Sequence, residues 1–158
     1  MATSFGFYAK EQGIILAGLT LMGAFIVQLI PIIKKKISDF SGLIILSIMM
    51  AVGFFAASFP IGYFGLFAML IIAIAAKLAD PWISIVINQA IPSKYRATTL
   101  STAALITRIP YVLIAVVAGN SIQAGNLSGF NMAVAMVIIA VLIMGIFLSR
   151  SSKVDKVV

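Results

Sequence analysis

The chain has 158 residues, of which 63% are hydrophobic and only 9% are charged. A soluble domain of this length lacks the interior to hide so much apolar surface, so the composition predicts an integral membrane protein. Lys and Arg number 11 against 4 acidic residues. Because these bases stand between apolar runs, they indicate membrane orientation and contact with anionic lipid, and we expect no nucleic-acid binding.

The chain contains neither cysteine nor histidine. Disulfides, thiol chemistry and imidazole metal ligands are therefore excluded. Paired carboxylates and phosphate-binding glycine loops are missing as well, so no catalytic constellation can be assembled. We expect a protein that is not an enzyme and that carries no metal and no cofactor.

Five apolar segments have about the 20 residues that a helix needs to cross the hydrocarbon core. In chain order they cover residues 12–33, 41–59, 62–89, 98–119 and 129–149. The predicted fold class is an all-α, polytopic membrane helix bundle, with residues 1–158 forming a single membrane domain. We expect a multi-pass protein of the cell (plasma) membrane.

Basic residues are concentrated in alternate connectors. Only Lys10 lies before the first segment, and the connectors after the second and fourth segments have no Lys or Arg. Cytoplasmic loops are the ones enriched in basic residues. The pattern therefore predicts an N-terminus outside and a cytoplasmic C-terminus. The basic residues of the other connectors and the C-terminal tail are Lys34, Lys35, Lys36, Lys94, Arg96, Arg150, Lys153 and Lys156.

Three prolines fall in or near the predicted spans, at Pro31, Pro81 and Pro110. Proline lacks a backbone N–H and can kink a helix. Such kinks occur in membrane helices where neighbouring groups form hydrogen bonds with the freed backbone groups.

The third and fourth segments each carry a polar stripe. Residues 77, 80, 84 and 88 are spaced 3, 4 and 4 apart, which places them on one helix face. The fourth segment has a similar small and polar face, and the short connector makes the two helices antiparallel neighbours. The stripe residues are Lys77, Asp80, Ser84 and Asn88 in the third segment and Ser101, Arg108 and Tyr111 in the fourth.

Asp80 lies ten residues from Ala90, and Arg108 lies ten residues from Thr98, on either side of the connector. That spacing puts both about 15 Å deep, where a charge costs roughly 2.5–3.5 kcal/mol. We expect Lys77, Asp80 and Arg108 to form a buried charge cluster beside a polar cavity, with Ser84 and Tyr111 as further lining residues. Such a site has net positive charge and favours an anionic group. The alternative is that both bases snorkel and Asp80 merely compensates them.

The connector between these segments reads NQAIPSKYRATTLS, from Asn88 to Ser101. Pro92 is expected to end the helix before it, and Thr98 or Thr99 to cap the next one. The stretch resembles the connector between the tenth and eleventh helices of major facilitator superfamily transporters, especially drug-efflux-like members. The positions that carry the resemblance are Asn88, Ile91, Pro92, Arg96, Ala97, Thr98, Leu100 and Ser101.

The resemblance implies that the chain corresponds to helices eight to twelve of a twelve-helix permease. Embedded in the lipid bilayer, it would then move a small organic solute or drug across the membrane, driven by a proton or ion gradient. One departure is that the family's loop signature after helix eight is reduced to Lys34, Lys35 and Lys36 followed by Asp39.

Five helices supply only part of one half, whereas alternating access needs two halves. We therefore expect an incomplete transporter that pairs with a missing N-terminal half or with another copy. The alternative is a truncated or split membrane protein with a structural or interaction role and no transport activity of its own.

Overall fold

The computed structural model describes residues 5, 6 and 8–154, and every regular element among them is helical. The predicted all-helical class is therefore confirmed. In chain order the elements are α1 (Ala9–Val27), α2 (Ile30–Lys34), α3 (Asp39–Ala56), the 3-10 helix η2 (Gly62–Phe64), α4 (Gly65–Ala90), α5 (Ser93–Gln123) and α6 (Leu127–Val154).

Four stretches of helix within the described residues are long and apolar enough to cross a membrane: Asp39–Ala56, Gly62–Ala90, Ser93–Gln123 and Leu127–Ser149. They support an integral membrane protein. The apolar part of α1, Glu11–Val27, is shorter than these four. The count of five spans and the orientation in the membrane therefore stay predictions.

The first predicted segment, 12–33, is not one helix. α1 ends at Val27, and the amides of Gln28 and Leu29 bond to carbonyls three residues back, at 3.2 and 2.9 Å. The cause is Pro31, which cannot donate to the carbonyl of Val27 and whose ring crowds it. Helix resumes as α2, with Pro31 in its first turn, where a missing N–H costs nothing.

α4 and α5 behave differently, because each continues through its proline, Pro81 or Pro110. α5 also begins five residues earlier than predicted, at Ser93 rather than Thr98. Pro92 is its N-cap residue, with the extended backbone (φ −55°, ψ 146°) that is typical of this position. The expected threonine cap is therefore wrong, and Thr99 lies inside the helix, donating from Oγ1 to the carbonyl of Tyr95 at 3.0 Å.

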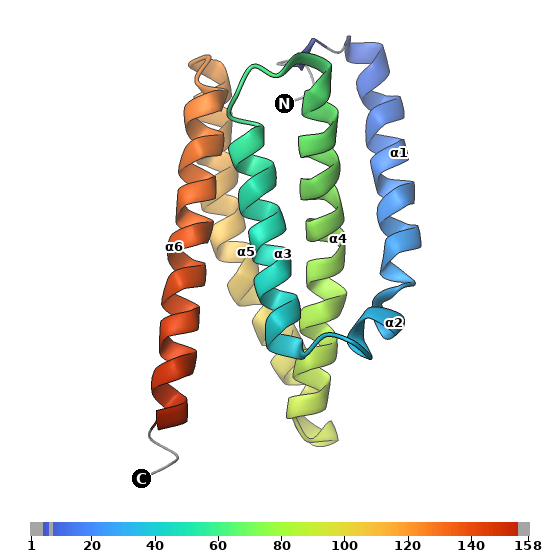
Figure 1. Ribbon diagram of the computed structural model, residues 1–158, viewed down its shortest axis with the longest axis vertical. Helices are drawn as coiled ribbons and strands as arrows, with labels where there is room; N and C mark the ends of the chain where they lie inside the picture. Colours follow the sequence, from blue (N-terminus) through green and yellow to red (C-terminus); the bar gives the residue numbers. More distant parts are fainter. Residues whose placement is uncertain (1–4, 7, 155–158) are drawn as a thin grey trace.

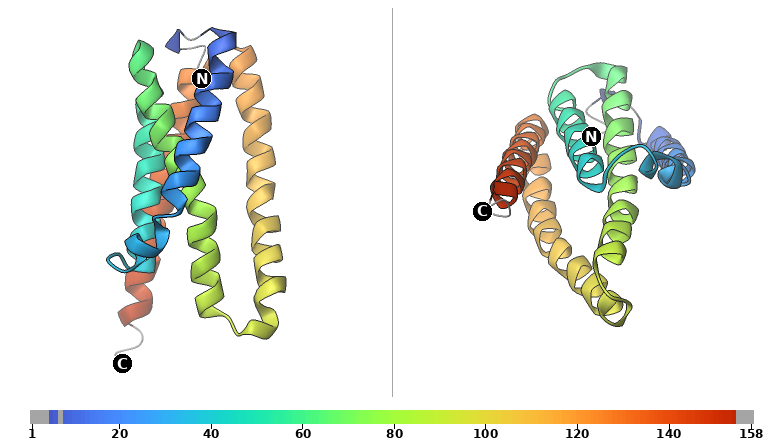
Figure 2. Two further views of the ribbon diagram at one scale, coloured as in Figure 1. Left: turned by 90° about the vertical axis from the view of Figure 1, so that its right-hand side faces the viewer. Right: turned by 60° about the horizontal axis from the view of Figure 1, so that its bottom comes forward.

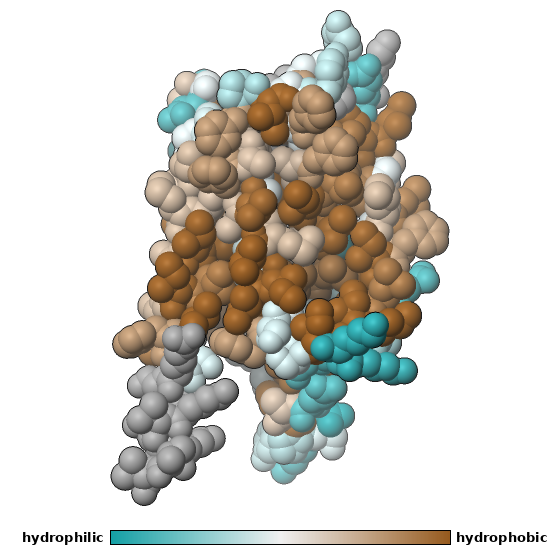
Figure 3. Space-filling model, in the orientation of Figure 1, coloured by the Kyte–Doolittle hydropathy of each residue, from teal (hydrophilic) through white to brown (hydrophobic). Residues whose placement is uncertain are grey.

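The long helices run up and down through the molecule (Figure 1). The α2–α3 connector, the α4–α5 connector and the end of α6 lie at the lower end of this view, whereas the α3–α4 and α5–α6 connectors lie at the upper end. The two connectors with basic residues and the end of α6 thus lie at the opposite end from the two connectors that lack Lys and Arg. In Figure 3 hydrophobic residues cover the middle of the visible face, and hydrophilic residues gather near its ends.

The most extensive packing is between α3 and α4, and small residues allow it. A Cβ at Gly42 would lie 2.0 Å from the Trp82 ring, and one at Gly53 would lie 2.6 Å from the side chain of Ile72. Close approach of helix backbones through small residues gains van der Waals contact where lipid offers no hydrophobic force. Buried hydrophobic residues form two clusters: one contains Ile30, Leu46, Leu78 and Trp82, and the other contains Phe5, Ala57 and Ala68.

α5 is the least covered of the long helices. None of its residues from Ser93 to Gln123 is buried within the bundle. Figure 2 shows it running alongside the rest, joined to α4 at one end and to α6 at the other. Its faces are therefore available to lipid or to another protein.

Candidate functional site

The polar stripe of α4 is a continuous face. Its last two members are linked, since the side-chain amide of Asn88 donates to Ser84 Oγ at 3.4 Å. Asp80 lies one turn further up, directly before Pro81, and Lys77 lies nearly one turn beyond it. The helix runs unbroken through this region, so the predicted spacing places these groups in a row.

A cavity of about 430 Å³ lies between α4 and α5, and we call it the α4–α5 cavity. It brings together four of the five residues predicted for the charge cluster and its surroundings. Its lining residues are Asp80, Ile83, Ser84 and Ile87 of α4 and Leu100, Ala103, Ala104, Thr107, Arg108 and Tyr111 of α5.

The acid and the base of this cavity face a shared space without forming an ion pair. Among the described residues, no Lys or Arg nitrogen lies within 4.0 Å of the Asp80 carboxylate. Asp80 and Arg108 are both exposed, as is Tyr111, which is 71% exposed. A carboxylate and a guanidinium that do not neutralise each other leave both charges available to a bound molecule.

Lys77 is directed elsewhere. It does not line the α4–α5 cavity, and its side-chain stem lies against Gly23 of α1, where a Cβ would come within 2.8 Å of Lys77 Cγ. The cluster of three charges therefore stays a prediction, and the structure groups only Asp80 and Arg108 around one cavity.

Thr107 is a lining residue that sequence reasoning missed. Its hydroxyl donates to the carbonyls of Ala103 and Ala104, both at 3.0 Å, and so is held against its own helix. The spacing of 104, 107 and 111 is that of one helix face and could have revealed it. The predicted face included Arg108 and omitted Thr107, the residue before it.

The connector residues hold the turn between the two helices. Pro92 ends α4 as predicted, since the helix stops at Ala90 and Ile91 is extended with φ −119° and ψ 135°. Arg96 closes the turn by donating from Nε to the carbonyl of Ile91 at 3.0 Å. Ser101 Oγ donates to the carbonyl of Thr98 at 3.0 Å, so both bond locally rather than to other helices.

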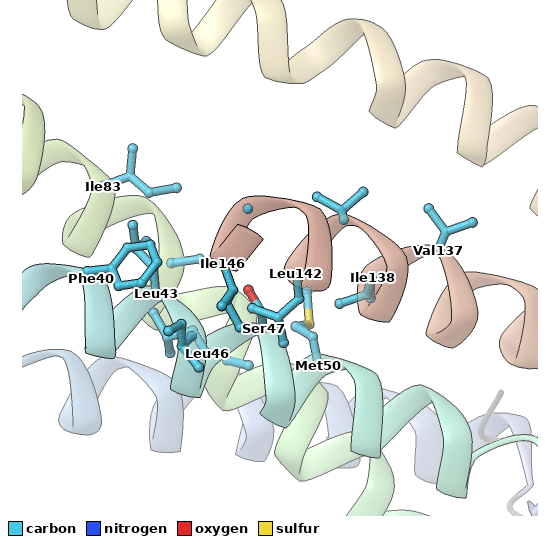
Figure 4. A pocket seen from close by; sticks show the side chains of 15 residues that line it. Phe40, Leu43, Leu46, Ser47, Met50, Ile83, Val137, Ile138, Leu142 and Ile146 are labelled. Atoms are coloured by element: carbon cyan, nitrogen blue, oxygen red, sulfur yellow. The ribbon is translucent and has the colours of Figure 1, made fainter. Parts of the chain in front are cut away.

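An apolar groove of about 570 Å³ adjoins this site. Figure 4 shows its walls, which come from α3, α4 and α6. Ile83 lines both the groove and the α4–α5 cavity, so the two spaces meet at this side chain. Ser47 is the only residue of the groove with a polar side chain, and the rest of its lining is hydrophobic or glycine.

A second cluster, also missed from the sequence, joins α2 to α3 and α4. Lys34 Nζ lies 2.7 Å from Asp39 Oδ1, donates to Gln89 Oε1 at 3.3 Å, and sits 5.6 Å from the centre of the Trp82 ring. The indole N–H of Trp82 donates to the carbonyl of Asp39 at 3.2 Å. These contacts fasten the start of α3 to α4.

Within the described residues, no group of three or more acidic, histidine or cysteine side chains is placed to hold a metal ion. Neither charged cluster therefore has the donors of a metal centre. No protein-family model, curated protein or solved structure matches the chain.

Proposed function

We propose that the chain forms one wall of the solute pathway of a secondary transporter similar to the C-terminal part of a major facilitator permease. The observation that carries the proposal is the α4–α5 cavity, in which Asp80 and Arg108 line one space without pairing. Ionisable side chains within membrane helices are expensive and commonly mark substrate or ion pathways. The plasma membrane is the proposed location.

The neighbouring spaces suggest the kind of solute. The α4–α5 cavity offers a carboxylate, a guanidinium and the hydroxyl of Tyr111, whereas the groove beyond Ile83 is apolar. A small organic molecule with a polar or charged group and an apolar body suits both. Asp80 is the acid available to exchange a proton or to attract a cation.

The exposure of α5 supports the view that further helices complete the pathway. A wall in which Arg108 forms no ion pair with any described acid is costly against lipid, and it becomes favourable against a polar surface of another protein. In the proposal this surface belongs to an N-terminal half or to another copy of the chain.

Transport in vesicles tests this proposal. The chain is reconstituted alone and together with the first seven helices of a major facilitator permease, and uptake of labelled organic cations, anions and neutral solutes is measured. We expect uptake only in the paired sample, and a loss of about tenfold or more in Asp80→Asn and Arg108→Gln, as for removal of a charged hydrogen-bonding group. Lys94→Gln, which removes a charge outside the cavity, is the matched control.

Uptake by the chain alone would contradict the need for an N-terminal half and would leave another copy of the chain as the partner. Uptake that is equal in Asp80→Asn, Arg108→Gln and Lys94→Gln would contradict the assigned site. The second candidate is an interaction subunit without transport, which the uncovered α5 also favours. Stable association with another membrane protein, without uptake of any probe by the complex, would support that candidate instead.

A further inference from the structure

A pocket of about 570 Å³ lies where the α2–α3 connector meets the end of α4, and we call it the basic pocket. It does not share a lining residue with the α4–α5 cavity. Its lining combines basic, polar and apolar side chains: Pro31, Lys34, Lys35, Ile37, Ser38, Asp39, Ile85 and Gln89. In Figure 3 hydrophilic residues lie beside the hydrophobic surface at this end of the molecule.

The acid of the pocket, Asp39, is already neutralised by another lining residue, Lys34. Lys34 pairs with Asp39 at 2.7 Å, and its side chain is only 13% exposed, so this pair has little charge to offer a ligand. Lys35 also lines the pocket, and Lys36 follows it directly. Both are exposed, and neither forms an ion pair with any described residue. Lys35 therefore places one uncompensated positive charge on the pocket, and Lys36 adds a second at the next position of the chain.

Gln89 adds directed hydrogen-bond donors. Its side-chain oxygen accepts from Lys34 at 3.3 Å, so the two N–H bonds of the same amide are its remaining hydrogen-bonding groups. Among the described residues, no group accepts a hydrogen bond from the Gln89 N–H groups. Ammonium and amide donors around one space suit the acceptor oxygens of a phosphate.

The surroundings are apolar and lie beside the membrane-spanning surface. Leu29 and Ile32 stand within two residues of the lining residue Pro31 and are 48% and 58% exposed, and Phe40, which follows Asp39, is 45% exposed. These side chains provide contact for acyl chains next to a headgroup. Basic pockets between membrane helices bind the headgroups of anionic lipids.

We propose that the basic pocket binds the phosphate-bearing headgroup of an anionic phospholipid, with Lys35, Lys36 and Gln89 as the recognising groups. The inference concerns a site apart from the α4–α5 cavity and holds whether or not the chain transports a solute.

Lipid binding to the detergent-solubilised full chain tests the proposal by native mass spectrometry. Phosphatidylglycerol is titrated against phosphatidylcholine with the same acyl chains. We expect preferential binding of phosphatidylglycerol, and a loss of affinity of roughly fivefold for each lysine removed in K35Q and K35Q/K36Q. The matched control K94Q/R96Q removes the same charge from the other connector at this end.

Retention of phosphatidylglycerol selectivity by K94Q/R96Q supports the site, and an equal loss in both double variants would overturn it in favour of unspecific attraction. Equal affinity of the unaltered chain for the two lipids would also overturn it. An excess of inorganic phosphate is expected to compete only weakly, whereas phosphate binding as tight as lipid binding would assign the pocket to a soluble anion. Circular dichroism checks the fold of each variant, and K35Q alone carries the test if K35Q/K36Q does not fold.

Discussion

The contact between Gly42 and Trp82 makes the substitution Gly42→Ala a sharp test of the packing. A Cβ at position 42 would lie 2.0 Å from Cζ2 and 2.3 Å from Cε2 of the indole. Carbon atoms pack comfortably at about 3.5–4.0 Å, so α3 and the ring must separate by roughly 1.5 Å. Trp82 is only 3% exposed and donates to the carbonyl of Asp39 at 3.2 Å, so its retreat breaks other contacts.

Overpacking of this kind lowers the free energy of unfolding by about 1–3 kcal/mol. The higher helix propensity of alanine than of glycine offsets at most about 1 kcal/mol of that loss. We expect Gly42→Ala to lower the free energy of unfolding by about 1–2 kcal/mol. Trp82 is the only tryptophan of the chain, so its fluorescence reports the contact directly during unfolding in detergent.

Gly145→Ala provides the matched control. This glycine also lies within a helix, α6, and a Cβ there meets nothing within 4 Å. We expect unchanged or slightly higher stability, by up to about 1 kcal/mol. If Gly42→Ala and Gly145→Ala have the same free energy of unfolding and the Trp82 emission does not change, the packing of the Trp82 ring against α3 is refuted.

Two further substitutions probe other contacts. Asn131→Ala removes a side chain that is 1% exposed and donates to the carbonyl of Ala57 at 3.0 Å, and we expect a loss of about 1–3 kcal/mol of unfolding free energy. The exposed Asn120→Ala is its control, and equal stability of the two variants would contradict the buried bond. Pro31→Ala restores the missing N–H, so we expect α1 and α2 to join into one helix, with slower hydrogen exchange of the amides of Gln28 and Leu29. Unchanged exchange would show that something other than the proline ends α1.

The helices themselves could be predicted because their signals are local. Long apolar runs and the basic residues between them identify four of the elements within a few residues, and the rule for residues before proline places the end of α4 at Pro92. The joint placement of Asp80 and Arg108 around one cavity follows from helix spacing and a short connector. The helix positions and this placement both depend on residues that are close together in the sequence.

The features that escaped prediction depend on contacts between distant segments. Lys34 and Gln89 are 55 residues apart, and Trp82 and Asp39 are 43 apart, so no periodicity links them. The direction of Lys77 toward Gly23 likewise depends on where α1 packs. The break between α1 and α2 had a visible cause in Pro31, but Pro81 and Pro110 leave their helices continuous, so proline alone does not locate a break.

The end of α3 has a consequence for the order in which the chain is assembled. The two residues that follow α3, Ala57 and Ser58, present carbonyls that accept from the side-chain amide of Asn131 and from the hydroxyl of Ser128, respectively. Both donors belong to α6, about 70 residues later in synthesis. Until α6 emerges and packs against α3, these two acceptors lack those partners, and a buried carbonyl without a hydrogen bond is costly. The upper end of α3 thus gains these two hydrogen bonds only once α6 is in place, and a ribosome stalled before α6 would leave both carbonyls open to the translocon or to a membrane chaperone.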